Sequence, residues 1–349
     1  MSRPADAPTT VLIGCLDAIA AGAVPLVIDE VSGQLAMALK QQGAAPQAWR
    51  RFADGAAVAE AWPAATAATS AFVRLGKDRR ALAMALDAAA SIVAPGGMIV
   101  LFGANAEGVK SAAKALEVVA DGVVTLDTRR HARVLAGTRR AEIAGLRGTL
   151  AAWREVRELA FAGRTRAWIG YPGVFAGGGL DDGTALLLDH LPELGVKRDG
   201  AAVLDLACGT GVIAAAVRER YPDARIDGVD ADAVAIAAAR ENVAGATLIC
   251  GDGLSAAPRA RYDAILSNPP IHDGVDESFA FLEQLIRDAP RYLGAGGILQ
   301  VVIPSRIRSA TAWFEAAFAE TIVVALDRRY QVIRAVKGAA KAKARPDGR

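Results

Sequence analysis

The fold of this 349-residue chain is set by the stretch Val203-Leu204-Asp205-Leu206-Ala207-Cys208-Gly209-Thr210-Gly211. A short apolar run with one acid leads into a glycine-containing turn, and a helix-like run over residues 212–217 follows. Gly209 and Gly211 let the backbone turn sharply and leave bare amide groups for a ligand. The pattern predicts a buried strand, a tight turn and a helix N-terminus, which is the start of a nucleotide-binding α/β unit.

Two further strand ends carry polar residues. Asp230 closes the apolar run 224–230, and Asn268-Pro269-Pro270 follows the run 262–267. In a doubly wound sheet, ligands lie at the carboxyl ends of the strands where the strand order reverses. Asp230 lies 19 residues after Gly211, a spacing that suits an acid accepting hydrogen bonds from ribose hydroxyls. We therefore expect these groups at one edge of one sheet.

A third acid follows a nearby apolar run. Gly251-Asp252-Gly253 comes directly after residues 247–250. This position favours Asp252 as an acceptor for an adenine amino group, although Gly-Asp-Gly is also ordinary turn chemistry. A nicotinamide site is a poor fit, because the glycine pattern would need glycine where Val212 stands, and a phosphate loop would need Gly-Lys-Ser/Thr.

Asn268-Pro269-Pro270 is the most specific element of the sequence. Two successive prolines lack amide hydrogens and fix φ, so they predict a rigid turn with outward carbonyls. Together with the Asn268 side-chain oxygen, these acceptors can bind both hydrogens of a planar NH2 group. Acceptors that favour positive charge developing on nitrogen stabilise the transition state of methyl transfer to that nitrogen. We therefore predict that Asn268, Pro269 and Pro270 form the catalytic corner.

The first half of the chain resembles a degenerate repeat of the second half. Val27-Ile28-Asp29 with Gly33 matches Val203-Leu204-Asp205 with Gly209, and Leu75-Gly76-Lys77 stands where the second half has Asn268-Pro269-Pro270. Strands that alternate with helices indicate parallel sheets in both halves. The expected fold is α/β, with two tandem Rossmann-like domains on doubly wound, mostly parallel sheets, the first domain (1–150) being degenerate and the second (151–349) catalytic.

Composition narrows the class of protein. The chain is 53% hydrophobic, has a formal net charge of +2, and contains three cysteines without CxxC spacing. These features predict a reduced, cytoplasmic protein without structural zinc or disulfides. No apolar run is long enough for a membrane span. We expect no metal, no membrane partner and a monomer.

Positive charge is concentrated in the middle of the chain. Residues 127–170 hold ten arginines against four acids, so this segment is +6 and the rest of the chain is −4. We expect residues 140–169 to form a helical connector whose Arg164 and Arg166 contact phosphates. The alternative is a solvated basic face.

The set formed by the glycine turn, Asp230 and Asn268-Pro269-Pro270 resembles class I S-adenosylmethionine-dependent amino methyltransferases. More narrowly, the chain is similar to the RsmC-type ribosomal RNA guanine-N2 methyltransferases, with RlmG-type enzymes as close relatives. The narrower resemblance rests on Pro172-Gly173-Val174-Phe175, Gly179-Leu180-Asp181, Gly183, Leu186-Leu187-Leu188 and the extension Ile271-His272-Asp273-Gly274.

The resemblance implies an enzyme that methylates a guanine N2 in ribosomal RNA, with the small subunit as the expected location, on naked RNA or an assembled subunit. It implies S-adenosylmethionine as cofactor and places the following residues in its site: Asp205, Ala207, Cys208, Gly209, Gly211, Asp230, Ala231, Asp252, Gly253 and Asn268. For the substrate it implies Phe175, Ile271 and His272 beside Arg164 and Arg166. Two other functions stay open: a protein glutamine N5-methyltransferase, and a non-catalytic RNA-binding assembly factor.

Two positions depart from the family pattern. Ala207 replaces the first glycine of the cofactor loop, and Ile271 stands where the family usually has an aromatic residue. An aromatic side chain there would stack on the flipped base. We expect Phe175, His272 or Phe279 to take over that packing.

Overall fold

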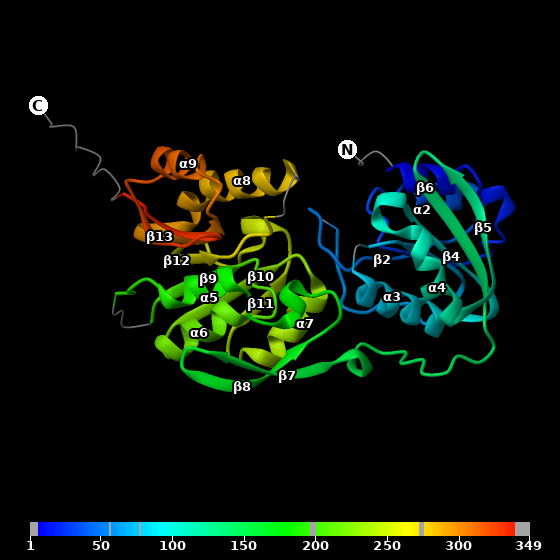
Figure 1. Cartoon of the computed structure of the whole chain (residues 1–349), viewed down its shortest axis with the longest axis horizontal. Helices are drawn as coiled ribbons and strands as arrows, with labels where there is room; N and C mark the ends of the chain where they lie inside the picture. The colour runs from blue at the N-terminus through cyan, green and yellow to red at the C-terminus, as the bar shows by residue number, and fades with distance from the viewer. Residues whose placement is uncertain (1–5, 56, 77, 196–199, 272–275, 339–349) are drawn as a thin grey trace, which may run out of the picture. The chain divides into compact units, whose positions relative to one another are not determined.

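The chain divides into two compact units, each with its own sheet and helices (Figure 1). The computed structural model describes residues 6–55, 57–76, 78–195, 200–271 and 276–338. The first unit comprises Met1–Glu155, Gly170–Gly177 and Asp232–Val234, and the second comprises Val156–Ile169, Gly178–Ala231 and Ala235–Arg349.

The second unit is built on a seven-stranded sheet in the order β11-β10-β9-β12-β13-β15-β14. Strand β15 is antiparallel to both of its neighbours, whereas the other neighbouring strands are parallel. All five residues of β9 are buried, as expected for a parallel strand that is covered on both faces. The strands are β9 (Ala202–Leu206), β10 (Arg225–Asp230), β11 (Thr247–Cys250), β12 (Tyr262–Ser267), β13 (Leu293–Pro304), β14 (Glu320–Leu326) and β15 (Tyr330–Val336).

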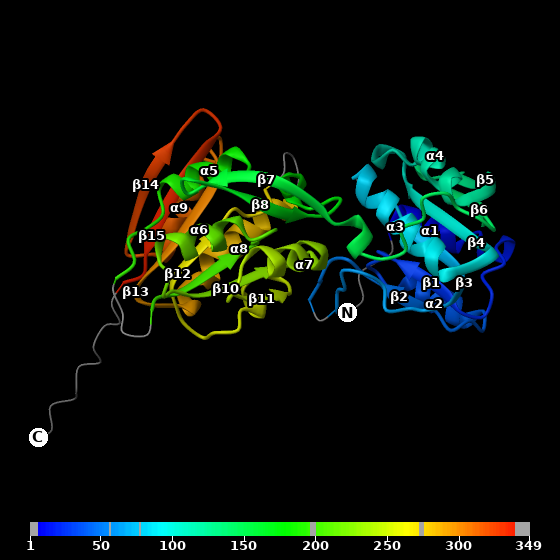
Figure 2. The ribbon, with the colours of Figure 1, turned by 90° about the horizontal axis from the view of Figure 1, so that it is seen from below.

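Helices cover both faces of this sheet (Figure 2). Successive side chains of β9 point to opposite faces, so Val203 packs with residues of α5 and α6 while Leu204 packs with residues of α8 and α9. The helices are α5 (Asp182–Asp189), α6 (Val212–Arg220), α7 (Ala233–Asn242), α8 (Asp276–Tyr292) and α9 (Ala310–Ala317), with the short η4 (Phe175–Gly178) and η5 (Gly253–Ala256).

The predicted helical connector over residues 140–169 is wrong. Residues 151–153 form the short helix η3 (Ala151–Trp153), and β7 (Glu155–Phe161) and β8 (Arg164–Gly170) form a hairpin. Ala162 and Gly163 both have positive φ values (49° and 72°), the backbone of a two-residue hairpin turn. Phe161 and Trp168 stack edge to face at 5.3 Å in the core, so burial of alternate side chains overrides helix propensity here.

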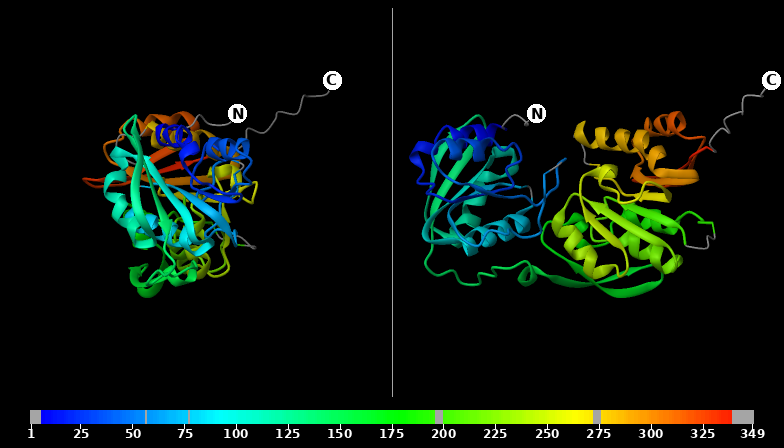
Figure 3. Two further views of the ribbon diagram at one scale, coloured as in Figure 1. Left: turned by 90° about the vertical axis from the view of Figure 1, so that its right-hand side faces the viewer. Right: turned by 180° about the vertical axis from the view of Figure 1, so that it is seen from behind.

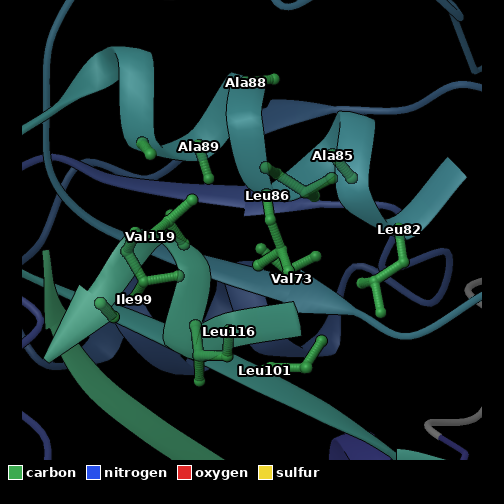
Figure 4. Packing of buried hydrophobic residues seen from close by; sticks show 14 of the residues in the cluster. Val73, Leu82, Ala85, Leu86, Ala88, Ala89, Ile99, Leu101, Leu116 and Val119 are labelled. Carbon is green, nitrogen blue, oxygen red and sulfur yellow. The ribbon is translucent and has the colours of Figure 1, made fainter. Parts of the chain in front are cut away.

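The first unit carries a six-stranded sheet in the order β2-β1-β3-β4-β6-β5. Figure 3 shows this unit, coloured from blue to green, in two further views. Figure 4 shows α3 and α4 packed on one face, with Leu86 near Val73 and Leu116 near Leu101. The elements are α1 (Ala7–Ile13), η1 (Leu16–Ala18), β1 (Pro25–Ile28), α2 (Gln34–Gln41), β2 (Gln47–Trp49), β3 (Ala68–Arg74), α3 (Arg79–Ile92), β4 (Val93–Ala104), η2 (Asn105–Glu107), α4 (Val109–Val119), β5 (Ala120–Arg129) and β6 (Ala132–Arg139).

The two sheets share one connectivity, which supports the predicted duplication. The first order matches the second strand for strand, except that no strand among the described residues stands in place of β11. Both sheets also have the same irregularity. The pairing of β3 with β4 jumps from Ala68↔Val93 to Ser70↔Met98, and that of β12 with β13 jumps from Tyr262↔Leu293 to Ala264↔Ile298.

The shared irregularity corrects the predicted alignment of the two halves. With Ser70 equivalent to Ala264, strand pairing makes Val27 equivalent to Asp205, and Gly33 equivalent to Gly211. At β1 and its turn the alignment predicted from sequence is therefore displaced by two residues, a shift that preserves the alternation of faces and so cannot be detected from hydrophobicity. The same register puts Arg74, and not the predicted Leu75, at the position of Asn268, so this correspondence was displaced by one residue.

Candidate active site

The glycine turn joins β9 to α6 through an unusual backbone. Ala207, Gly209 and Gly211 have φ values of 56°, 54° and 90°. A Cβ on Gly211 would lie 2.6 Å from a Val243 side-chain carbon, so only glycine fits at that position. Ala207 adopts a left-handed conformation despite its side chain, which costs roughly 1–2 kcal/mol.

Side chains from outside the turn hold it in place. The Trp168 indole N–H donates to Thr210 Oγ1 at 2.9 Å, and Asn242 Nδ2 donates to the Thr210 carbonyl at 3.0 Å. Cys208 is buried, and its backbone N–H donates to the Val229 carbonyl of β10 at 3.1 Å. The turn is therefore preorganised before any ligand binds.

Asp205 lies beneath the turn with an unusual environment. Its side chain is 1% exposed, Oδ2 accepts from the Ala214 N–H at 2.9 Å, and Oδ1 is buried without a hydrogen-bond partner. Burial, with a smaller contribution from the negative charge of Asp230, raises the pKa of Asp205 to about 7. An unsatisfied buried acceptor is costly unless a donor is supplied, so this carboxyl fits a cationic amine held by the turn.

Asp230 and Asp252 lie at the neighbouring strand ends, as predicted. Asp230 Oδ2 accepts from the Gly209 N–H at 2.7 Å, which ties the end of β10 to the turn, and Ala231 follows directly. Asp252 is exposed after β11 and, with Gly253 and Leu206, lines a hollow of about 260 Å³ beside α8.

Asn268 is held by two residues that lie far away in the sequence. Its Nδ2 donates to Asp181 Oδ1 at 3.0 Å and to Thr184 Oγ1 at 2.9 Å. Asp181 is the N-cap of α5 and also accepts from the N–H groups of Thr184 and Gly183. Sequence reasoning assigned no role to Asp181 or Thr184. Aspartate is nevertheless a preferred N-cap residue, because its carboxylate accepts hydrogen bonds from N–H groups of the first helical turn.

This anchoring sets the direction of the Asn268 amide. An ionised carboxylate only accepts hydrogen bonds, so the amide nitrogen must face Asp181. The carbonyl Oδ1 then points away from α5, and it accepts no hydrogen bond from the residues that the structure describes. The site therefore presents one fixed acceptor oxygen at the end of β12.

The two prolines differ in their surroundings. Pro269 is buried and its carbonyl accepts from the Ile271 N–H at 2.8 Å, whereas Pro270 is exposed. Ile271 and Phe279 are half-buried against the core formed by α8 and α9. His272 lies outside the described residues.

Two predicted substrate contacts, Arg164 and Arg166, are not brought to this site. Arg164 and Arg166 both pair with Glu219, at 3.3 and 3.1 Å. Glu219 is in the last turn of α6, which starts at the carboxyl ends of the strands and runs back, so this pair lies at the opposite end of the sheet. Phe175 is 53% exposed in η4, a segment that groups with the first unit.

The fold and the site define a class. A doubly wound sheet with a glycine turn after its first strand, an acid after the second and Asn-Pro-Pro after the fourth is that of a class I S-adenosylmethionine-dependent methyltransferase. Among the described residues no group of three histidines, cysteines or acids is placed to hold a metal ion. No helix of that part of the chain has the length and apolar character to cross a membrane.

Comparisons with known proteins agree with this class. Residues 167–334 match the family model "Methyltransferase small domain", and residues 17–150 match "Methyltransferase small domain N-terminal". Ribosomal RNA small subunit methyltransferase C of Pseudomonas fluorescens is 39% identical over 68% of this chain and 70% of its own length. The protein of that name from Pseudomonas entomophila is 34% identical over 77% of this chain and 79% of its own length.

A solved structure has the same fold throughout. The T. thermophilus 16S rRNA N2 methyltransferase (RsmC), solved in complex with AdoMet and guanosine, superposes with a TM-score of 0.81. The match covers 95% of this chain and 92% of that one at 23% identity. The chain belongs to the ribosomal RNA small subunit methyltransferase C family, which confirms the resemblance, the tandem fold and the methyltransferase activity predicted from sequence.

Proposed function

We propose that this enzyme transfers a methyl group from S-adenosylmethionine to the exocyclic N2 amine of a guanine in small-subunit ribosomal RNA. The observation that carries the proposal is the Asn268 carbonyl oxygen, which Asp181 and Thr184 turn away from α5. A fixed acceptor at a strand end suits a substrate that offers an N–H donor. Relatives named for this activity support the choice of substrate.

The residues of the glycine turn would hold the cofactor. The buried, unpartnered Asp205 Oδ1 fits the amine of its methionine part, and Asp230 fits the ribose hydroxyls. Asp252 and Gly253 line the hollow that fits the adenine. The cofactor supplies an electrophilic methyl group on a sulfonium, and every other contribution comes from the chain.

Asn268 acts on the charge that develops during transfer. As the N2 lone pair forms its bond to the methyl carbon and the carbon–sulfur bond breaks, the nitrogen becomes positive and its hydrogens become more acidic. Asn268 Oδ1 accepts one of those hydrogens more strongly in that state than before, so it lowers the barrier. The ammonium then loses one proton to water, and no charged base is needed.

The rigid corner keeps that oxygen in place. Pro269 is buried, and Ser267 Oγ donates to the Leu206 carbonyl at 2.7 Å, which joins the end of β12 to the end of β9. The acceptor is thus fixed relative to the turn that binds the cofactor. Preorganised dipoles of this kind cost no reorganisation during reaction.

The test uses small ribosomal subunits and protein-free rRNA from a strain that lacks this enzyme. Purified protein and methyl-labelled cofactor are added, and the nucleosides are then separated. The expected product is N2-methylguanosine in small-subunit rRNA, with Asn268→Ala as the inactive control. Label in protein glutamine would instead support the glutamine methyltransferase, and bound cofactor without any product would support an assembly factor.

We further propose that the enzyme works in the cytoplasm as a monomer, because its proposed substrate is the ribosomal subunit and one chain already carries both sheets. Light scattering of the purified protein checks the oligomeric state. A mass of twice 36.1 kDa would contradict it.

A further inference from the structure

A second hollow opens in the second unit next to the Asn-Pro-Pro corner. It measures about 460 Å³, and its walls are Ile271, the carboxyl end of β13 and the turn between β14 and β15. Pro304 pairs with Tyr330, so both walls lie at the sheet edge that carries Asn268. The lining residues are Ile271, Pro304, Ser305, Arg306, Arg328, Arg329 and Tyr330.

The two walls are fixed to each other through their backbones. The Ser305 N–H donates to the Arg329 carbonyl at 2.8 Å, and Ser305 Oγ donates to the Arg328 carbonyl at 3.0 Å. Asp327 Oδ1 accepts from the N–H groups of Arg329 and Tyr330 at 2.7 and 2.6 Å. Arg328 and Arg329 therefore project from a rigid turn.

The charge around the hollow is positive. Arg306, Arg328 and Arg329 line it, and Asp182 and Asp327 contact Arg329. Arg329 pairs with Asp182 and lies over the Tyr330 ring at 5.6 Å. Arg328 pairs with no acid among the described residues, so its guanidinium fork is available to an anion.

The hollow is connected to the acceptor that holds the amine. Ile271 forms one wall and directly follows Asn268-Pro269-Pro270. On the other side, a Cβ added to Gly183 would lie 3.1 Å from the Tyr330 ring, so that ring packs tightly on the first turn of α5. The same turn carries Asp181 and Thr184, the anchors of Asn268.

We propose that this arginine hollow binds the phosphodiester backbone of the RNA beside the methylated guanine. The inference rests on the rRNA methyl transfer proposed above. A base inside a helix must leave its stack to reach an active site, and the backbone around it must then be held. Guanidinium forks match phosphate oxygens in pairs, and phosphate contacts set the register of a nucleic acid without reading its sequence.

The hollow replaces the basic pair that the sequence favoured. Arg164 and Arg166 share Glu219, and Arg166 also lies over the Phe161 ring at 4.3 Å, so both guanidinium groups already have a partner within the fold. The arginine hollow differs in lying at the catalytic edge with an arginine that has no acid partner in the described part of the chain.

The test compares two double variants that remove the same charge. Arg306→Gln/Arg328→Gln changes the arginine hollow, and Arg164→Gln/Arg166→Gln is the matched control. Binding of an unmodified small-subunit rRNA transcript is followed by fluorescence anisotropy over a series of salt concentrations. Cofactor affinity and thermal midpoint check that each variant is folded.

We expect the hollow variant to bind RNA at least about tenfold more weakly, since it loses hydrogen bonds between charged groups. The slope of log affinity against log salt should become shallower by about 1.4, because each single-strand phosphate that is no longer neutralised accounts for roughly 0.7. The control should stay within about twofold of the wild type. Unchanged affinity in the hollow variant, or equal losses in both variants, would overturn the proposal.

Binding does not depend on turnover, so this experiment separates the two proposals. If the wild-type protein binds the transcript through the hollow but forms no N2-methylguanosine, the proposed function is contradicted and the phosphate site is supported. If the hollow variant methylates at the wild-type rate at low RNA concentration, the phosphate site alone is contradicted.

Discussion

Each unit has a helix-capping aspartate that binds a side chain at the end of the equivalent strand, but the two side chains it binds have different hydrogen-bonding properties. In the second unit the helix cap Asp181 and Thr184 hold the amide of Asn268. In the first unit Asp6 caps α1 by accepting from the Thr9 N–H at 2.8 Å, and its other oxygen accepts from Arg74 at 2.8 Å. Arg74 stands at the position of Asn268 in the shared strand register.

The change from asparagine to arginine removes the acceptor. A guanidinium only donates hydrogen bonds, and Arg74 also pairs with Glu107 at 2.6 Å. The cofactor side has changed as well, because Val27 replaces Asp205 and Val31 replaces Gly209 in the same register. The scaffold therefore tolerates loss of the chemistry, since the cap and the strand end are kept for folding while the functional groups are replaced.

The largest effect is expected when the second unit receives the first unit's residue. We expect Asn268→Arg and Asn268→Ala to lower the methylation rate by ~10²–10³, as when one preorganised polar group is removed from a transition state. Single-turnover kinetics measure the rate, and calorimetry should find cofactor binding largely retained. A normal rate in Asn268→Ala would take this side chain out of the mechanism.

The converse change concerns the first unit. Arg74→Met leaves Asp6 and Glu107 without their partner, so we expect the free energy of unfolding to fall by about 1–3 kcal/mol, discounted because Asp6 is half exposed. Methylation at saturating substrate should not change. Chemical denaturation and a rate assay check both statements, and a rate loss would assign catalytic work to the first unit.

Asp205 has no ionisable counterpart at Val27, so its pH dependence belongs to the second unit. Its pKa is raised to about 7, so the folded protein binds a proton that the unfolded chain has already lost between about pH 4 and 7. Unfolding free energy should therefore fall as the pH rises through this window.

Cofactor binding should show the opposite trend. An ionised Asp205 suits a cationic amine, so affinity for S-adenosylmethionine should rise by about fivefold from pH 6 to pH 7, reach about tenfold by pH 8 and level off above. Calorimetry in buffers of different ionisation enthalpy should find that binding releases a proton. Asp205→Asn should remove the pH dependence, and a flat wild-type profile would refute the assignment.

Thr184 tests the anchor itself. Thr184→Val removes one acceptor of the Asn268 amide while Asp181 still caps α5, so we expect the rate to fall by about five- to tenfold, the value of one neutral hydrogen bond. Thr184→Ser keeps the hydroxyl and should restore the rate. If Thr184→Ser were as slow as Thr184→Val, packing of the methyl group would be the cause.

The smallest effect concerns a backbone feature that both units share. Ala207 has a φ of 56°, and Asp29, its equivalent, has a φ of 57°. Ala207→Gly should relieve roughly 1–2 kcal/mol of backbone strain. The greater entropy of glycine in the unfolded chain offsets part of this gain, so we expect a net stabilisation of about 0.5–1 kcal/mol. A lower thermal midpoint would mean that the methyl group packs usefully.

The local chemistry of this protein could be predicted from its sequence. The run 203–211 and the corner 268–270 each combine a strand with its own turn, and glycine and proline act within a few residues of their position. The family resemblance rests on these local signals, and the predicted order of strand, turn and helix holds in the second unit. The degenerate first half was also visible, although its predicted register was displaced by two residues at β1 and by one residue at the position of Asn268.

The meeting of distant residues, in contrast, depends on the tertiary structure. Asp181 lies 87 residues before Asn268, and Arg328 is brought to the wall opposite Ile271 by the pairing of β13 with β15. The basic connector is likewise a hairpin whose arginines pair with Glu219. Parallel strands gather their ends at one edge whatever their separation in the chain, so these contacts depend on the order of strands in the sheet, which hydrophobic periodicity does not encode.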